Sequence, residues 1–183
     1  MRKLILLAAL AASMSGLLLF GSTLPRKAPE FVFKMTDGTQ QLLSQFRGKT
    51  IVLAFMYTTC PHCQHTAQVL TKVQTEYKDR GVQVLGACFD NDAQKNTRQF
   101  NTQLGLNFPV GISSQAPVLE FVQYPPNDPY FVPILVFIDK AGMIRSQYIG
   151  DEKFLDKQET NIRLEIDKML KSPAAAPKAA PKS

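Results

Sequence analysis

The chain has 183 residues, with 21 Lys and Arg against 15 Asp and Glu, which gives a formal net charge of +6. The excess lies at the ends of the chain, because residues 28–171 hold 15 residues of each sign and the other six basic residues flank them. Nucleic-acid binding needs a basic surface on the folded part of a protein. The charge therefore argues against a nucleic-acid partner, and the length fits one domain with appendages.

The two ends differ in composition from the middle. Met1-Arg2-Lys3 precedes an apolar run from Leu4 to Phe20, the pattern of an export signal. This run is longer than the usual signal core of about 7–15 residues and shorter than the roughly 20 residues of a spanning helix. Residues 1–24 are thus a cleaved signal peptide or an N-terminal anchor that associates with the membrane through residues 4–20. The Pro-, Ala- and Lys-rich residues 172–183 predict a disordered tail.

Residues 28–171 predict a single domain of alternating strands and helices. The order begins with a strand over 31–35 and a short helical turn over 42–49. Later strands are expected over 50–56, 82–89, 108–112, 133–138 and 143–149. Helices are expected over 60–80, 93–104, 113–122 and 154–170, and 124–129 is a Pro-rich loop.

The hydrophobic patterns predict how the strands and helices are layered. The run Thr50–Met56 is continuously apolar, as in a strand buried on both faces of a sheet. Along 60–80, apolar residues recur at helical spacing, at Ala67, Leu70, Val73 and Tyr77. This alternation predicts an α/β fold with helices on both faces of the sheet. A right-handed crossover places the start of helix 60–80 at the carboxyl edge of strand 50–56.

The segment Thr59-Cys60-Pro61-His62-Cys63 stands at that edge. Cys60 falls near the helix N-cap with Pro61 at the first helical position, and Cys63 lies one turn further on the same side, close enough for a disulfide. Free helix N–H groups and the helix dipole favour negative charge on the Cys60 sulfur, and a protonated His62 adds to this. We expect Cys60 to attack a disulfide and Cys63 to resolve the mixed disulfide.

Structural explanations for these cysteines are weaker. A zinc site needs four ligands, and beyond the pair the chain offers only His62, His65 and Cys88. A disulfide that closes so small a loop stabilises little. Cys88 ends a buried strand and is expected in the core, and the run 90–92 is expected to cap the next helix rather than to hold a metal. No metal site is predicted.

Two segments resemble the redoxin (TlpA/ResA-like) branch of the thioredoxin superfamily. The first is 46–55 followed by Cys60-Pro61-His62-Cys63, and the second is Val132-Pro133 through Gly142. The resemblance implies a thioredoxin-like fold, a central mixed sheet flanked by helices with an N-terminal strand extension. It also implies that Pro133 is a cis-proline facing the cysteine pair, where the Val132 backbone binds substrate polypeptide as an added strand, bordered by Thr59 and Pro61.

Two positions depart from the family pattern. Thr59 replaces the usual aromatic residue, and Ala54 replaces the buried acid of thioredoxins. The dipeptide Pro61-His62 matches the oxidising DsbA-type motif, whereas the redoxin framework more often belongs to reductases, so the direction of electron flow stays open. Glu120 lies in a segment where some redoxin reductases carry a functional acid.

The sequence therefore predicts an exported, periplasmic or extracytoplasmic thiol–disulfide oxidoreductase. Its partners would be protein thiols and disulfides, with a membrane electron donor or acceptor, and it would need no cofactor beyond the redox-active disulfide of Cys60 and Cys63. Two alternatives share the fold. A Sco-like copper chaperone needs three residues between its cysteines and a distant His, but no His follows His65. A peroxiredoxin-like peroxidase needs Pro and Thr or Ser where this chain has Leu53 and Tyr57.

Overall fold

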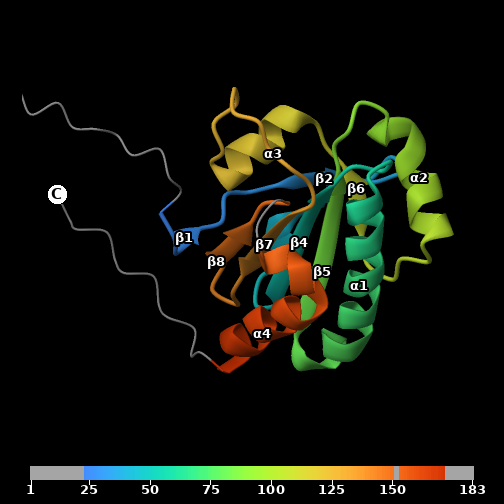
Figure 1. Ribbon diagram of the computed structural model, residues 1–183. Coiled ribbons are helices and arrows are strands. Elements are labelled where there is room, and N and C mark those ends of the chain that lie inside the picture. The colour runs from blue at the N-terminus through green and yellow to red at the C-terminus, as the bar shows by residue number, and fades with distance from the viewer. Residues whose placement is uncertain (1–22, 151–152, 172–183) are drawn as a thin grey trace, which may run out of the picture.

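The computed structural model describes residues 23–150 and 153–171 (Figure 1). The tail 172–183 and nearly all of the signal or anchor segment 1–24 lie outside these residues, so those two predictions stay untested. Within the described residues, no helix is both long and apolar enough to cross a bilayer.

Eight strands form one mixed sheet in the order β1-β8-β7-β4-β5-β6-β2-β3. Three pairings decide the position of the site: β4 runs parallel to β5, β5 runs parallel to β6, and β4 runs antiparallel to β7. The strands are β1 (Arg26–Lys27), β2 (Val32–Lys34), β3 (Gln40–Leu42), β4 (Thr50–Met56), β5 (Val82–Cys88), β6 (Val110–Ile112), β7 (Ile134–Ile138) and β8 (Met143–Tyr148).

Helices cover both faces of this sheet, as Figure 1 shows. Side chains of α1, α2 and α4 pack on one face, and α3 packs on the other with the N-terminal strands. The α-helices are α1 (Pro61–Tyr77), α2 (Ala93–Gln103), α3 (Gln115–Val122) and α4 (Gln158–Lys171). Short 3-10 helices are η1 (Leu43–Phe46), η2 (Lys78–Arg80) and η3 (Lys153–Lys157).

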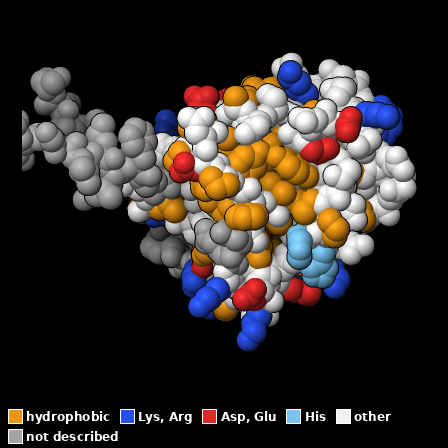
Figure 2. Space-filling model, turned by 45° about the horizontal axis from the view of Figure 1, so that its top comes forward, with side chains coloured by type: hydrophobic (Ala, Val, Ile, Leu, Met, Phe, Trp, Pro, Cys, Tyr) orange, Lys and Arg blue, Asp and Glu red, His pale blue; other side chains and the backbone are white. Residues whose placement is uncertain are grey.

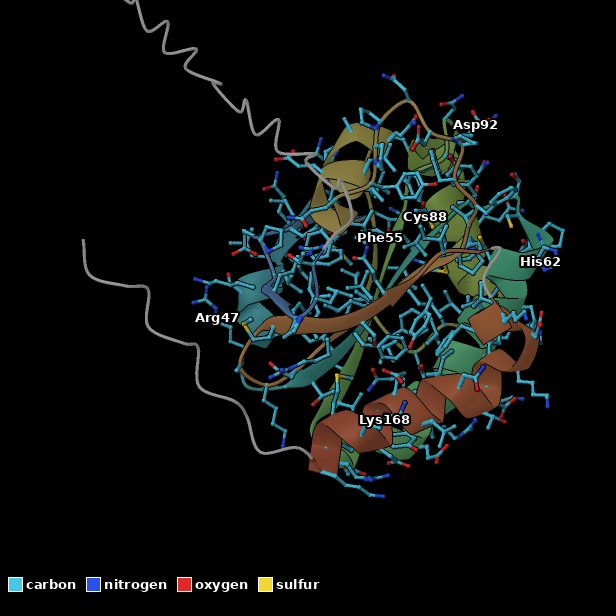
Figure 3. All side chains as sticks on the ribbon, turned by 60° about the vertical axis from the view of Figure 1, so that its left-hand side comes forward. Arg47, Phe55, His62, Cys88, Asp92 and Lys168 are labelled. Carbon is cyan, nitrogen blue, oxygen red and sulfur yellow. The ribbon has the colours of Figure 1, made fainter. Side chains whose placement is uncertain are left out.

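The strand β4 divides the core in two. Val52, Ala54 and Met56 face α1, whereas Leu53 and Phe55 face α3, and all are fully buried. The alternation follows from the period of two residues along a strand. Phe55 lies in the middle of the molecule (Figure 3) and makes edge-to-face contacts with Phe31 and Phe121.

The predicted fold class is confirmed, and the differences lie at element ends. The helix expected over 60–80 ends at Tyr77 and continues as η2 up to Gly81, which has a left-handed φ of 80°. The strand expected over 108–112 begins at Val110. The sequence did not predict β1 or β3, because two or three mostly polar residues carry no periodic signal.

Parallel pairing brings the ends of β4 and β5 together. Met56 pairs with Cys88, so the segments that follow them leave the same edge of the sheet. The first leads to Cys60 and α1, and the second leads to Asp90 and α2. The expected location of the cysteine motif, at the carboxyl edge of strand 50–56, is confirmed.

We predict that Phe55→Ala lowers the free energy of unfolding by about 3–5 kcal/mol, because it leaves a cavity in a fully packed cluster. The matched change Phe131→Ala should cost less than about 0.5 kcal/mol, because Phe131 is 54% exposed. Urea unfolding followed by circular dichroism measures both. Equal costs for the two variants would contradict the assignment of Phe55 to the core.

Candidate active site

The two cysteines of the motif lie at the start of α1 with different exposure. Cys60 is the N-cap residue and is partly exposed, and Pro61 takes the first helical position. Cys63 is fully buried beneath it. The main-chain N–H of Cys63 donates to the Cys60 sulfur at 3.4 Å. Both thiols are free, and the outer sulfur lies at the N-cap of α1, the position that the sequence predicted.

Burial controls the chemistry of the inner thiol. It raises the pKa of Cys63 well above the ordinary value for a cysteine, and the neighbouring Cys60 sulfur raises it further. The main-chain N–H of Tyr57 donates to the Cys63 sulfur at 3.4 Å and opposes this shift only in part. At neutral pH the buried thiol therefore keeps its proton, and the outer sulfur is the one that a substrate can reach.

The loop before β7 closes the other side of the site. The Cys60 sulfur lies 3.9 Å from the carbonyl oxygen of Val132, and the Val132–Pro133 peptide bond is cis. The expectation of a cis-proline facing the cysteines is confirmed. The loop before β7 therefore places a main-chain carbonyl beside the Cys60 sulfur.

An acidic side chain from the loop after β5 holds the segment between β4 and Cys60. Both carboxylate oxygens of Asp90 accept hydrogen bonds from Thr58, one from its N–H and one from its Oγ1, each at 2.8 Å. The side-chain amide of Gln64 donates to the Thr58 carbonyl at 3.1 Å. These bonds fix the turn that carries Cys60 relative to β5 and α1.

Comparison with known proteins gives the family. Residues 25–162 match the Redoxin family. The chain belongs to the redoxin family. The thiol-disulfide oxidoreductase ResA of Geobacillus kaustophilus is 30% identical over 67% of this chain and 67% of that protein, and ResA of Geobacillus thermodenitrificans is 29% identical over the same shares. A thiol:disulfide interchange protein of the thioredoxin family from Chlorobium tepidum TLS has a TM-score of 0.67 at 21% identity, covering 82% of this chain and 99% of that one.

These findings confirm the thioredoxin-like fold and the class of thiol–disulfide oxidoreductase for this redoxin. The structure also places the remaining predicted site residues. Thr59, Pro61 and His62 are exposed around the nucleophile, and Val132 is half-buried. Figure 3 shows His62 at the surface, at the start of α1. His65 faces solvent as expected.

Two other predicted residues lie away from the reactive sulfur. Cys88 is fully buried in the core, and burial raises its pKa to about 12, which confirms its expected structural position. Glu120 is exposed on α3 and lines a groove of about 610 Å³ whose lining includes Asp90 but neither cysteine of the pair. Among residues 23–150 and 153–171, no group of three or more His, Cys, Asp or Glu side chains is placed to hold a metal ion.

The expectation that residues 90–92 cap the next helix is confirmed in position but not in the side-chain bond. Asp92 occupies the N-cap of α2, but its side chain makes no capping hydrogen bond, and Asp90 is used by Thr58 instead. The signal for Asp90 was available, because it follows a strand parallel to β4 and so had to reach the same sheet edge.

A second supporting residue was also missed. A Cβ on Gly150 would lie 2.7 Å from the carbonyl oxygen of Val132 and 2.9 Å from its nitrogen. The N–H of Gly150 donates to the carbonyl of Phe131 at 3.3 Å. Only glycine allows this approach, so Gly150 positions the carbonyl beside Cys60. No local pattern in the sequence reveals a contact between residues 18 positions apart.

We predict that Asp90→Ala lowers the free energy of unfolding by about 1–3 kcal/mol, because it leaves the two donors of the buried Thr58 unpaired. Asp92→Ala is the matched control, since it removes a carboxylate two residues away that makes no capping hydrogen bond, and should cost less than about 0.5 kcal/mol. Chemical unfolding of the two variants side by side measures the difference. Similar values would show that the Asp90 bonds do not hold the turn.

Proposed function

We propose that this redoxin exchanges disulfides with polypeptides outside the cytoplasm, with Cys60 as the nucleophile and Cys63 as the resolving thiol. The observation that carries the proposal is the contrast between the two sulfurs at one helix start. Cys60 is accessible, accepts an N–H bond and lies 3.9 Å from the carbonyl oxygen of Val132, whereas Cys63 is enclosed directly beneath it.

The first step is attack by the Cys60 thiolate on a substrate disulfide. A bond forms between the Cys60 sulfur and one substrate sulfur, the substrate S–S bond breaks, and the second substrate sulfur leaves as a thiolate. The N–H of Cys63 and the helix dipole stabilise the attacking anion. Val132 supplies main-chain groups that hold the substrate chain beside the sulfur.

The second step resolves the mixed disulfide. Cys63 loses its proton to solvent and attacks the Cys60 sulfur, and the first substrate sulfur leaves as a thiolate. The substrate disulfide is thereby reduced to two thiols, and the protein dithiol is oxidised to the Cys60–Cys63 disulfide. The reverse sequence oxidises a substrate dithiol. The exchange requires only these thiols, so we expect no cofactor.

We assign His62 a role in setting the reduction potential of the cysteine pair. Its side chain is exposed and directly follows Pro61 at the positive end of α1. When protonated, it stabilises the Cys60 thiolate and therefore the reduced form, which makes the disulfide a stronger oxidant. The potential of the pair then decides which direction of exchange dominates.

The proposed location outside the cytoplasm rests on the N-terminal sequence. Basic residues followed by the apolar run Leu4–Phe20 fit an export signal or an anchor. Disulfides persist in such compartments, where a redox-active pair has substrates. A dithiol enzyme there needs a source or sink of electrons, for which a membrane donor or acceptor is the expected partner.

We predict that Cys60→Ser lowers the rate of disulfide reduction at least about a thousandfold, because it removes the nucleophile. Cys63→Ser should instead retain the first step and accumulate a mixed disulfide at Cys60, detectable by mass spectrometry after acid quenching. Cys88→Ser, which removes a cysteine that lies outside the pair, should react like the natural chain. Accumulation of a mixed disulfide at Cys88 would contradict the assignment.

We predict that resolution of the mixed disulfide accelerates about tenfold per pH unit between about pH 6 and pH 9. The buried Cys63 has a raised pKa, so below that pKa its thiolate fraction grows in proportion to the hydroxide concentration. Stopped-flow release of the first substrate thiol measures this step, and Cys63→Ser isolates the attack by Cys60 for comparison. A plateau in the resolution rate below pH 8 would overturn the expectation.

A further inference from the structure

An exposed aromatic side chain stands one residue from the carbonyl that faces the nucleophile. Phe131 is 54% exposed, the most exposed of the large hydrophobic side chains that the structure describes. It precedes Val132, whose carbonyl oxygen is 3.9 Å from the Cys60 sulfur. Leaving a phenylalanine ring in water forgoes the stabilisation that its burial would bring.

Phe131 belongs to a larger apolar surface. Tyr130 and Val132 flank it in the chain, and Tyr57 and Tyr124 contact Tyr130. All four are partly buried and pack against the core. Figure 2 shows hydrophobic side chains gathered on one face of the molecule, next to the two histidines. Because the chain has only two histidines, His62 and His65, the gathered side chains lie beside the start of α1. The apolar surface therefore continues into the reactive site.

Several contacts hold this surface in a fixed shape. The hydroxyl groups of Tyr57 and Tyr130 are 2.6 Å apart, and the Tyr130 ring stacks with Phe89 at 6.1 Å. The Tyr124 hydroxyl donates to the carbonyl of Pro129 at 2.7 Å, which closes the loop on itself. The Phe131 carbonyl accepts the Gly150 N–H. A preformed surface binds with less loss of conformational freedom than a flexible loop.

The geometry also defines the occupant. A substrate must bring its own sulfur to Cys60, and consecutive Cα atoms lie 3.8 Å apart, so residues one or two positions from the substrate cysteine reach Phe131. The segment Tyr124–Phe131 contains a single charged residue, Asp128. An extended polypeptide with apolar side chains beside its cysteine complements this surface, and a charged or small polar neighbour does not.

Resting on the proposed function, we infer that Phe131 is a specificity-determining residue, which selects polypeptide disulfides whose cysteines are flanked by apolar side chains. The ring contacts these side chains while the Val132 backbone holds the substrate chain. The Tyr57–Tyr130 hydroxyl pair keeps the surface aligned with the site, because the Tyr57 N–H also donates to the Cys63 sulfur.

The test compares two peptides of equal length, each a symmetric dimer joined by one disulfide. One peptide has Leu at the positions that flank the cysteine, and the other has Ser there. The reduced full-length chain is mixed with each peptide, and the second-order rate constant for release of peptide thiol is measured. The variants are Phe131→Ser, Phe131→Leu and Leu164→Ser. Leu164, on α4, is 52% exposed and is the matched control for loss of a surface hydrophobic group.

The natural chain should reduce the Leu peptide about three- to tenfold faster than the Ser peptide. Phe131→Ser should bring this ratio near one, whereas Phe131→Leu and Leu164→Ser should keep most of it. A ratio near one in the natural chain, or an unchanged ratio in Phe131→Ser, would overturn the inference. The measurement on the natural chain tests the inference even if Phe131→Ser fails to fold. Failure of the natural chain to reduce either peptide would instead reject the proposed function.

Discussion

The parallel pairing of β4 with β5 is the constraint from which the whole site follows. Because Met56 lies opposite Cys88, the segments that follow the two strands leave the sheet at the same edge. The segment after β4 leads into α1 and places Cys60 at the helix N-cap. The segment after β5 contains Asp90, which accepts two hydrogen bonds from Thr58 and so links the two segments. Antiparallel β7 then brings the Val132 carbonyl against the sulfur.

The site separates its two sulfurs by depth, and this separation assigns their roles. Ala54, fully buried in the same cluster as Cys63, provides no carboxylate to accept the Cys63 proton. Burial raises the pKa of the inner thiol. In the proposed exchange, this raised pKa makes resolution by Cys63 slow at neutral pH.

Much of this arrangement could be predicted from the sequence. Three features sufficed for the fold class and for the position of the cysteine pair at the start of α1. They are the continuous apolar run of β4, the helical spacing of apolar residues along α1, and the Cys60-Pro61-His62-Cys63 segment at their junction. These features are local and periodic, so each is visible within one or two elements. The resemblance to redoxins added the cis bond before Pro133, which no pattern in the residues themselves could show.

What the sequence did not predict depends on contacts between distant segments. The Asp90–Thr58 bonds join residues 32 positions apart, and the close approach of Gly150 to Val132 joins residues 18 positions apart. The Tyr57–Tyr130 hydroxyl pair spans 73 positions. Such pairs depend on strand register and loop path, which hydrophobic periodicity does not determine.

The most direct test of the central claim is the equilibrium of the full chain with glutathione redox buffers, followed by thiol labelling and mass spectrometry. The account predicts one reversible two-electron couple between Cys60 and Cys63, with Cys88 unchanged throughout. A midpoint near about −120 mV would mark an oxidant tuned by His62, and one near or below about −270 mV would mark a reductase. Absence of a reversible couple between these two cysteines would contradict the account and favour copper binding by the thiols.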